Sequence, residues 1–98
     1  MSKMQAWFVP VEGEPQSVLL PMKDYMRHVS NTYFPGRTLD FTKVRFKGRL
    51  CHMVVDDTGM VDGLPVNPVA TEAYHANCKP GTVHSIHGPA LIFGGLLP

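Results

Sequence analysis

Residues 39–55, LDFTKVRFKGRLCHMVV, decide the fold class because they hold the clearest strand pattern of the chain. Leu39–Phe46 and Leu50–Val55 are rich in β-branched and aromatic residues, which suit a pleated sheet, and Lys47-Gly48 between them suits a tight connection. The apolar run Met53–Val55 predicts that the second strand is central in its sheet. The stretch therefore predicts two neighbouring strands of a larger sheet.

A further hairpin is predicted towards the N-terminus. Ala6–Glu12, AWFVPVE, has the composition of a strand and runs into a turn signal, and Gln16–Leu20 forms the returning strand. Pro10 donates no ladder hydrogen bond, so it should confine the first strand to a sheet edge or to a bulge.

Two helices are predicted between the strands. The first begins at Pro21 and ends at Phe34-Pro35-Gly36, because apolar residues between these points follow a helical spacing: Met22, Tyr25, Met26, Val29 and Tyr33. The second begins at Asn67, whose side chain can cap free backbone N–H groups, with Pro68 at the first helical position. This helix closes at Asn77 and Pro80-Gly81.

The remaining segments complete the order β-β-α-β-β-α-β. Met60–Val66 is expected to be a short extended piece, and Thr82–Phe93 a last extended segment interrupted at Gly88-Pro89. This order predicts an α+β fold, a small and mainly antiparallel sheet with two helices on one face. The residues expected in the core are Trp7, Phe8, Leu19, Leu20, Met26 and Val54.

Length and composition limit the class of protein. With 98 residues, 44% apolar and 17% charged, the chain is expected to form a single domain over residues 1–98. The formal net charge of +1 excludes a global field that would draw it to nucleic acid or to an anionic membrane. No signal-peptide pattern and no apolar run of about 20 residues is found, and the two cysteines suit free thiols. A cytoplasmic protein without membrane contact is expected.

The segment Asp56–Pro68, DDTGMVDGLPVNP, resembles a small family of phage and bacterial proteins catalogued as domain of unknown function 3846. The matching positions are Asp57, Gly59, Gly63, Leu64, Pro65 and Asn67, and the flanks extend the likeness over about residues 6–94. Asp56 and Met60 depart from the family's usual Asn and Lys, and the family's Gly-Gly-x-Ile-Glu turn after the first helix is lacking. The resemblance implies an accessory protein of phage or mobile-element type in a bacterial cytoplasm. It implies no activity, since the motif residues Gly59, Gly63, Leu64, Pro65 and Asn67 shape the backbone.

One group of residues has the chemistry of a zinc site. Zinc takes four imidazole or thiolate ligands, and four such side chains fall within thirteen positions: His75, Cys78, His84 and His87. Their spacing lacks the usual two pairs of ligands a dozen or more residues apart, and a strand would point His84 and His87 to opposite faces. The alternative is that the histidines are solvated or hydrogen-bonded. No metal or other cofactor is therefore expected.

Alternating positions near the central hairpin carry positive charge: Lys43, Arg45, Lys47 and Arg49. A continuous strand would place all four on one face, where they could follow a phosphate backbone while Phe41 or Tyr33 stacked on bases. Gly48 can break this register. The alternative interpretation is a solvated edge strand, which Lys and Arg protect from edge-to-edge aggregation.

The sequence offers only weak candidates for catalysis. Cys51 with His52, and Ser85 with His84 and Asp57, have suitable chemistry, but neighbours on a strand point to opposite faces. We therefore expect a non-enzymatic interaction domain, and the family resemblance implies that its partner is a host or phage protein. Weak nucleic-acid binding through Lys43–Arg49 is the alternative, and a homodimer could form through an exposed apolar edge.

Overall fold

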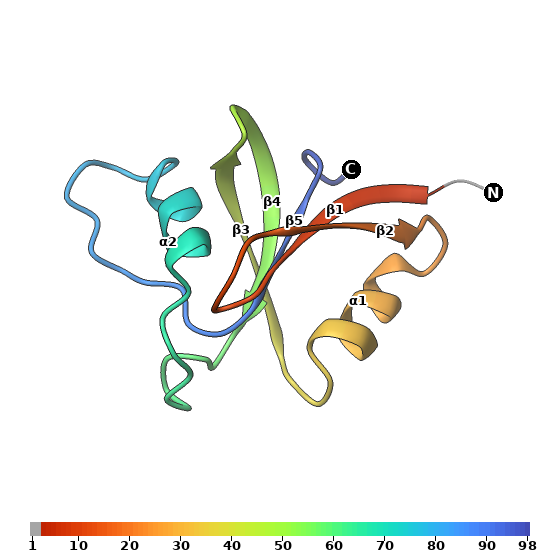
Figure 1. The fold of residues 1–98 in the computed structure, drawn as a ribbon, viewed down its shortest axis with the longest axis horizontal. Coiled ribbons are helices and arrows are strands. Elements are labelled where there is room, and N and C mark those ends of the chain that lie inside the picture. The colour runs from red at the N-terminus through yellow and green to blue at the C-terminus, as the bar shows by residue number, and fades with distance from the viewer. Residues whose placement is uncertain (1–2) are drawn as a thin grey trace.

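The computed structural model describes residues 3–98 as one five-stranded antiparallel sheet flanked by two helices (Figure 1). The strands and helices are β1 (Lys3–Val9), β2 (Gln16–Pro21), α1 (Tyr25–Tyr33), β3 (Leu39–Phe46), β4 (Arg49–Asp56), α2 (Pro68–His75) and β5 (Ala90–Phe93). Their spatial order in the sheet is β2-β1-β5-β4-β3. The predicted α+β class and the predicted order of elements are confirmed.

The hairpin of β3 and β4 forms as its sequence predicts. Phe46 pairs with Arg49, and the two residues between them, Lys47 and Gly48, have φ values of 52° and 74°. Positive φ at both central residues is the pattern of a type I′ turn, whose twist matches that of the strands. The strand β4 lies inside the sheet between β3 and β5, as its apolar run predicts.

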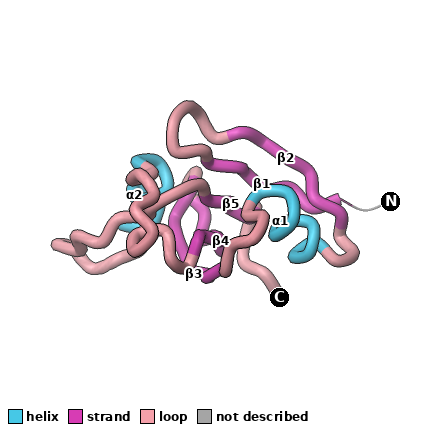
Figure 2. Tube along the Cα trace, turned by 90° about the horizontal axis from the view of Figure 1, so that it is seen from below, coloured by secondary structure: helices cyan, strands magenta, loops and turns pink. Residues whose placement is uncertain are grey.

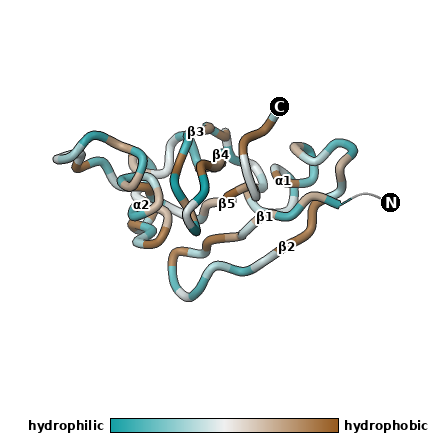
Figure 3. The backbone as a smooth tube through the Cα atoms, turned by 90° about the horizontal axis from the view of Figure 1, so that it is seen from above, coloured by the Kyte–Doolittle hydropathy of each residue, from teal (hydrophilic) through white to brown (hydrophobic). Residues whose placement is uncertain are grey.

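The short strand β5 joins the two hairpins into one sheet. It pairs with β1 on one side and with β4 on the other, and all four of its residues are buried. Figure 3 shows the apolar character of the central strands β4 and β5. The two edges of the sheet are therefore β2 and β3.

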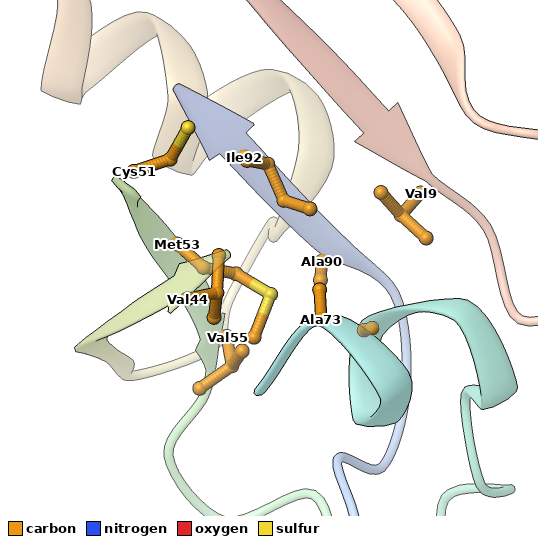
Figure 4. Packing of buried hydrophobic residues seen from close by; sticks show 9 residues of the cluster. Val9, Val44, Cys51, Met53, Val55, Ala73, Ala90 and Ile92 are labelled. Atoms are coloured by element: carbon orange, nitrogen blue, oxygen red, sulfur yellow. The ribbon is translucent and has the colours of Figure 1, made fainter. Parts of the chain in front are cut away.

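The two helices lie on opposite faces of the sheet, which corrects the expectation that both share one face (Figures 1 and 2). Alternate residues of β5 enter different cores: Ala90 and Ile92 face α2, whereas Leu91 and Phe93 face α1. Both faces of β5 are apolar, so both need a cover. The core under α2 consists of Val9, Val44, Cys51, Met53, Val55, Ala70, Ala73, Ala90 and Ile92 (Figure 4).

Three details of the N-terminal half differ from expectation. The helix α1 begins at Tyr25, and Pro21 ends β2, an edge strand that tolerates a residue without an N–H. The strand β1 is interior, because Pro10 follows its last residue and does not interrupt it. Leu19 is 65% exposed and therefore outside the core, whereas Leu20 and Val54 are fully buried.

The loops around α2 also differ from expectation. Residues 57–63 form turns, and of the segment Thr82–Phe93 only β5 is strand; residues 82–86 are irregular. A single bridge, Val66 with His87, is all the sheet-like pairing that these two loops make.

Within residues 3–98, no helix is long and apolar enough to span a bilayer.

Candidate functional site

A hollow lies beside α2, at the end of the sheet away from the Lys47-Gly48 turn. Its volume is ≈ 340 Å³. Side chains from β3, β4, α2 and both adjoining loops line it: Asp40, Val55, Asp56, Asp57, Met60, Tyr74, His84, Ser85, Ile86 and His87. Concave sites with apolar walls and a few polar groups are the usual places for ligands, so we take this hollow as the candidate site.

Asn67 connects three backbone segments next to the hollow. Its side chain is fully buried, and Nδ2 donates to the carbonyls of Val9 and Gly88, both at 3.0 Å. Its Oδ1 accepts from the N–H of Ala70 at 3.1 Å, which caps α2 as predicted. One amide thus ties the end of β1, the segment before β5 and the start of α2 to one another.

The glycines of the motif allow the two loops to approach closely. A Cβ on Gly59 would lie 2.5 Å from the carbonyl oxygen of His87, so no larger residue fits there without movement. Gly63 has a φ of +75°, which favours glycine. Two main-chain bonds join the loops where they cross, Asn67 N–H to Ile86 O and Gly88 N–H to Pro65 O, both at 2.8 Å. Gly59 thus lets the loop of residues 57–66 lie directly against His87, which lines the hollow.

Arg37 neutralises one of the carboxylates at the hollow. Its guanidinium donates to both oxygens of Asp56, whose side chain is 2% exposed, and to Asp62 Oδ2 at 2.6 Å. Burial alone would raise the pKa of Asp56, but the bonds from Arg37 and from the Thr58 N–H together outweigh it and hold the pKa below its ordinary value. Asp56 is therefore charged in the folded protein and compensated, and no local sequence pattern indicates this partner.

This carboxylate makes the stability depend on acid. A carboxyl group whose pKa is lower in the folded than in the unfolded state stabilises the fold at pH values above its unfolded pKa, which is about 3.9 for Asp. This stabilisation is lost as the pH falls through the pKa of the folded state. Asp56→Asn is therefore expected to destabilise the protein at pH 7, and the difference from wild type should shrink towards pH 3. Urea unfolding at pH 7, 5 and 3 measures this difference. A stability difference between Asp56→Asn and wild type that is the same at all three pH values would contradict the lowered pKa of Asp56. Asp57→Asn, at an exposed carboxylate, is the control and should lose less stability at pH 7.

The four residues with zinc-site chemistry do not come together. His75 Nε2 bonds to the carbonyl of His84, and His87 Nδ1 lies 2.9 Å from the carbonyl of Leu64; a carbonyl only accepts, so both ring nitrogens donate. Cys78 interacts with Tyr74 instead and raises the pKa of its phenol. Among residues 3–98, no three His, Cys, Asp or Glu side chains are placed to hold a metal ion. Two of the histidines thus serve to fix loops.

Of the catalytic candidates, one set shares the hollow. Ser85, His84 and Asp57 all line it, because residues 82–86 are irregular and the strand argument that separated them does not apply. Activation of a serine nucleophile requires a hydrogen bond to a base. Within the described chain, however, no hydrogen bond joins Ser85 to His84 or to Asp57. Cys51 and His52 do point to opposite faces: Cys51 is in the core under α2, and His52 Nδ1 accepts from the Leu97 N–H at 2.8 Å.

The four basic residues do not form one stripe. Lys43 and Arg45 lie on the sheet face opposite the buried Val44, whereas the turn carries Lys47 and Arg49 to the α2 side. Two main-chain groups of β3 are capped by side chains, the Lys43 carbonyl by Asn77 and the Phe41 N–H by Asp40. These caps favour the interpretation of β3 as a protected edge.

Comparison with protein-family models, with curated proteins and with solved structures found no match for this chain. The family resemblance of Asp56–Pro68 therefore stays a prediction.

Proposed function

We propose that this protein is a non-enzymatic interaction domain that uses the hollow beside α2 to bind a protein segment carrying a basic side chain between apolar residues. The observation that carries the proposal is the combination of two uncompensated carboxylates inside the hollow with exposed apolar side chains around it. By the family resemblance, the partner would be a bacterial host or phage protein.

The loops that border the hollow expose large apolar side chains. Val61 and Val83 are 86% and 85% exposed, and Met60 and Val66 are 56% and 45% exposed. Apolar groups gathered at a rim are typical of a surface that a partner covers, whereas single exposed ones are ordinary.

The charge of the hollow selects the partner. Arg37 compensates Asp56, but among residues 3–98 no ion pair reaches Asp40 or Asp57. The hollow has room for one long side chain, and its apolar walls, Val55, Tyr74 and Ile86, suit the methylene stem of Lys or Arg. A cation that enters from a partner would meet the two carboxylates that line the hollow.

Selection from a randomised peptide library displayed on beads tests this proposal, because it requires no identified partner. The enriched peptides are expected to contain Lys or Arg next to Leu, Ile, Val or Phe. Their affinity should fall at least about fivefold for Asp57→Asn and for Val83→Ser, because loss of one buried charge contact or one apolar contact removes about 1 kcal/mol or more.

Matched variants lie on the first hairpin, whose residues do not line the hollow. Glu14→Gln removes an exposed carboxylate from the β1–β2 turn, and Leu19→Ser removes an exposed apolar group from β2. Both should bind the enriched peptides as wild type does. Enrichment of acidic peptides, or equal losses in the two pairs of variants, would contradict the proposal.

A further inference from the structure

A second recognition surface lies at the opposite end of the β3–β4 hairpin. Two hollows adjoin there and share Phe46 and Lys47. One, of ≈ 260 Å³, lies between the end of β3 and α2; the other, of ≈ 210 Å³, lies between Trp7 and Arg49. Together they form a path across the tip of the hairpin, which we call the tip groove.

Aromatic rings and cations alternate along the tip groove. The Lys47 ammonium lies 4.7 Å from the centre of the Trp7 ring and 5.5 Å from that of Phe46, and the two rings meet edge to face at 5.9 Å. Arg49 is held at one end, where Nη1 donates to the Gly94 carbonyl at 2.9 Å. The groove thus offers flat apolar faces with positive charge beside each.

The cations of the tip groove are not neutralised by carboxylates. Among residues 3–98, the ion pairs involve Arg37 alone, so Lys47 and Arg49 keep their charge for a ligand. One acid, Glu72 on α2, lines the first hollow and weakens the field there. The carboxylates of the candidate site lie at the other end of the hairpin.

We propose that the tip groove binds single-stranded nucleic acid. Proteins bind single strands through a positive groove that follows the phosphates and through aromatic side chains on which bases stack, and the tip groove has both. A base would replace the Lys47 ammonium over Trp7, because stacking on an aromatic ring is stronger than an exposed cation–π contact. The released ammonium would then pair with the adjoining phosphate. The tip groove is separate from the candidate site that Asp57 and His84 line.

Trp7 is the only tryptophan of the chain, so its fluorescence reports directly on the groove. Titration of the whole protein with an unlabelled oligothymidylate of about twelve nucleotides at 50 mM salt is expected to quench this emission. Raising the salt to 200 mM should weaken binding about sevenfold, as two phosphate contacts on a single strand require.

Variants of the turn separate this site from general charge effects. Lys47→Asn with Arg49→Gln should lose at least tenfold in affinity and still fold, because Asn-Gly suits a type I′ turn. Lys23→Gln, which removes an exposed charge next to α1, should bind as wild type does, and Glu72→Gln should bind more tightly. Absence of quenching at 50 mM salt, or unchanged affinity in the double variant, would overturn the proposal. Equal quenching by polyglutamate would show that the groove takes acidic protein segments and would also overturn it.

Discussion

Replacement of Asn67 by Ala is expected to lower the free energy of unfolding by about 3–7 kcal/mol. The change removes the cap of α2, which contributes about 1 kcal/mol, and leaves the carbonyls of Val9 and Gly88 buried without a donor, at about 1–3 kcal/mol each. Because a domain of this size has about 5–15 kcal/mol in total, this one side chain decides whether the fold survives. Urea unfolding followed by circular dichroism measures the loss.

Three further variants divide this effect into its parts. Asn67→Ser keeps an oxygen that can cap α2 but has no amide group, so its loss should be intermediate. Asn67→Asp keeps the acceptor and places a carboxylate against two carbonyls, so it should be at least as damaging as Ala at pH 7. Asn77→Ala, at an exposed amide with one long bond of 3.4 Å, should change stability by less than about 0.5 kcal/mol. A loss below about 1 kcal/mol in Asn67→Ala would contradict the role assigned to this residue.

Gly59→Ala is expected to cost about 2–3 kcal/mol and to abolish peptide binding at the hollow beside α2. The added Cβ would meet the His87 carbonyl oxygen at 2.5 Å, and both atoms belong to segments whose main chains are hydrogen-bonded across the crossing. Relief of the contact would have to move His87, which lines the hollow. Thermal unfolding and the affinity for the enriched peptides measure the two effects.

Gly95→Ala is the matched control, because a Cβ there meets no atom within 4 Å and needs no unusual backbone angle. It should leave both stability and peptide affinity near wild type. If Gly59→Ala changed stability and peptide affinity as little as Gly95→Ala does, this result would contradict the close contact between Gly59 and His87.

The sequence predicted the local elements well and their arrangement in space less well. Residues 39–55 predicted β3, the turn and β4 because strand composition and a Lys-Gly pair act locally. Asn67-Pro68 likewise predicted the start of α2. The position of α2 relative to α1 is not a local property, and it is set by the insertion of β5 between the hairpins, which makes both faces of the sheet apolar.

The candidate sites were predicted only in part, for the same reason. A strand would separate Ser85 from His84, yet both lie in a loop, and a second loop brings Asp57 to the same hollow. The pair of Arg37 with Asp56 joins residues nineteen positions apart across a turn, and neither carries a local signal. The basic residues were identified, but the turn divides them between two faces and brings Lys47 to Trp7, a residue that sequence reasoning assigned to the core.

The most direct test of the proposed function is the amide spectrum of the ¹⁵N-labelled protein during titration with a synthetic peptide that has one Lys between two Leu residues. The proposed function predicts that the amides that shift lie in residues 57–66 and 83–87, around the hollow beside α2. It also predicts that a peptide with Glu in place of the Lys leaves these amides unmoved. Shifts confined to α1 and β2, or the same shifts with the Glu peptide, would contradict it.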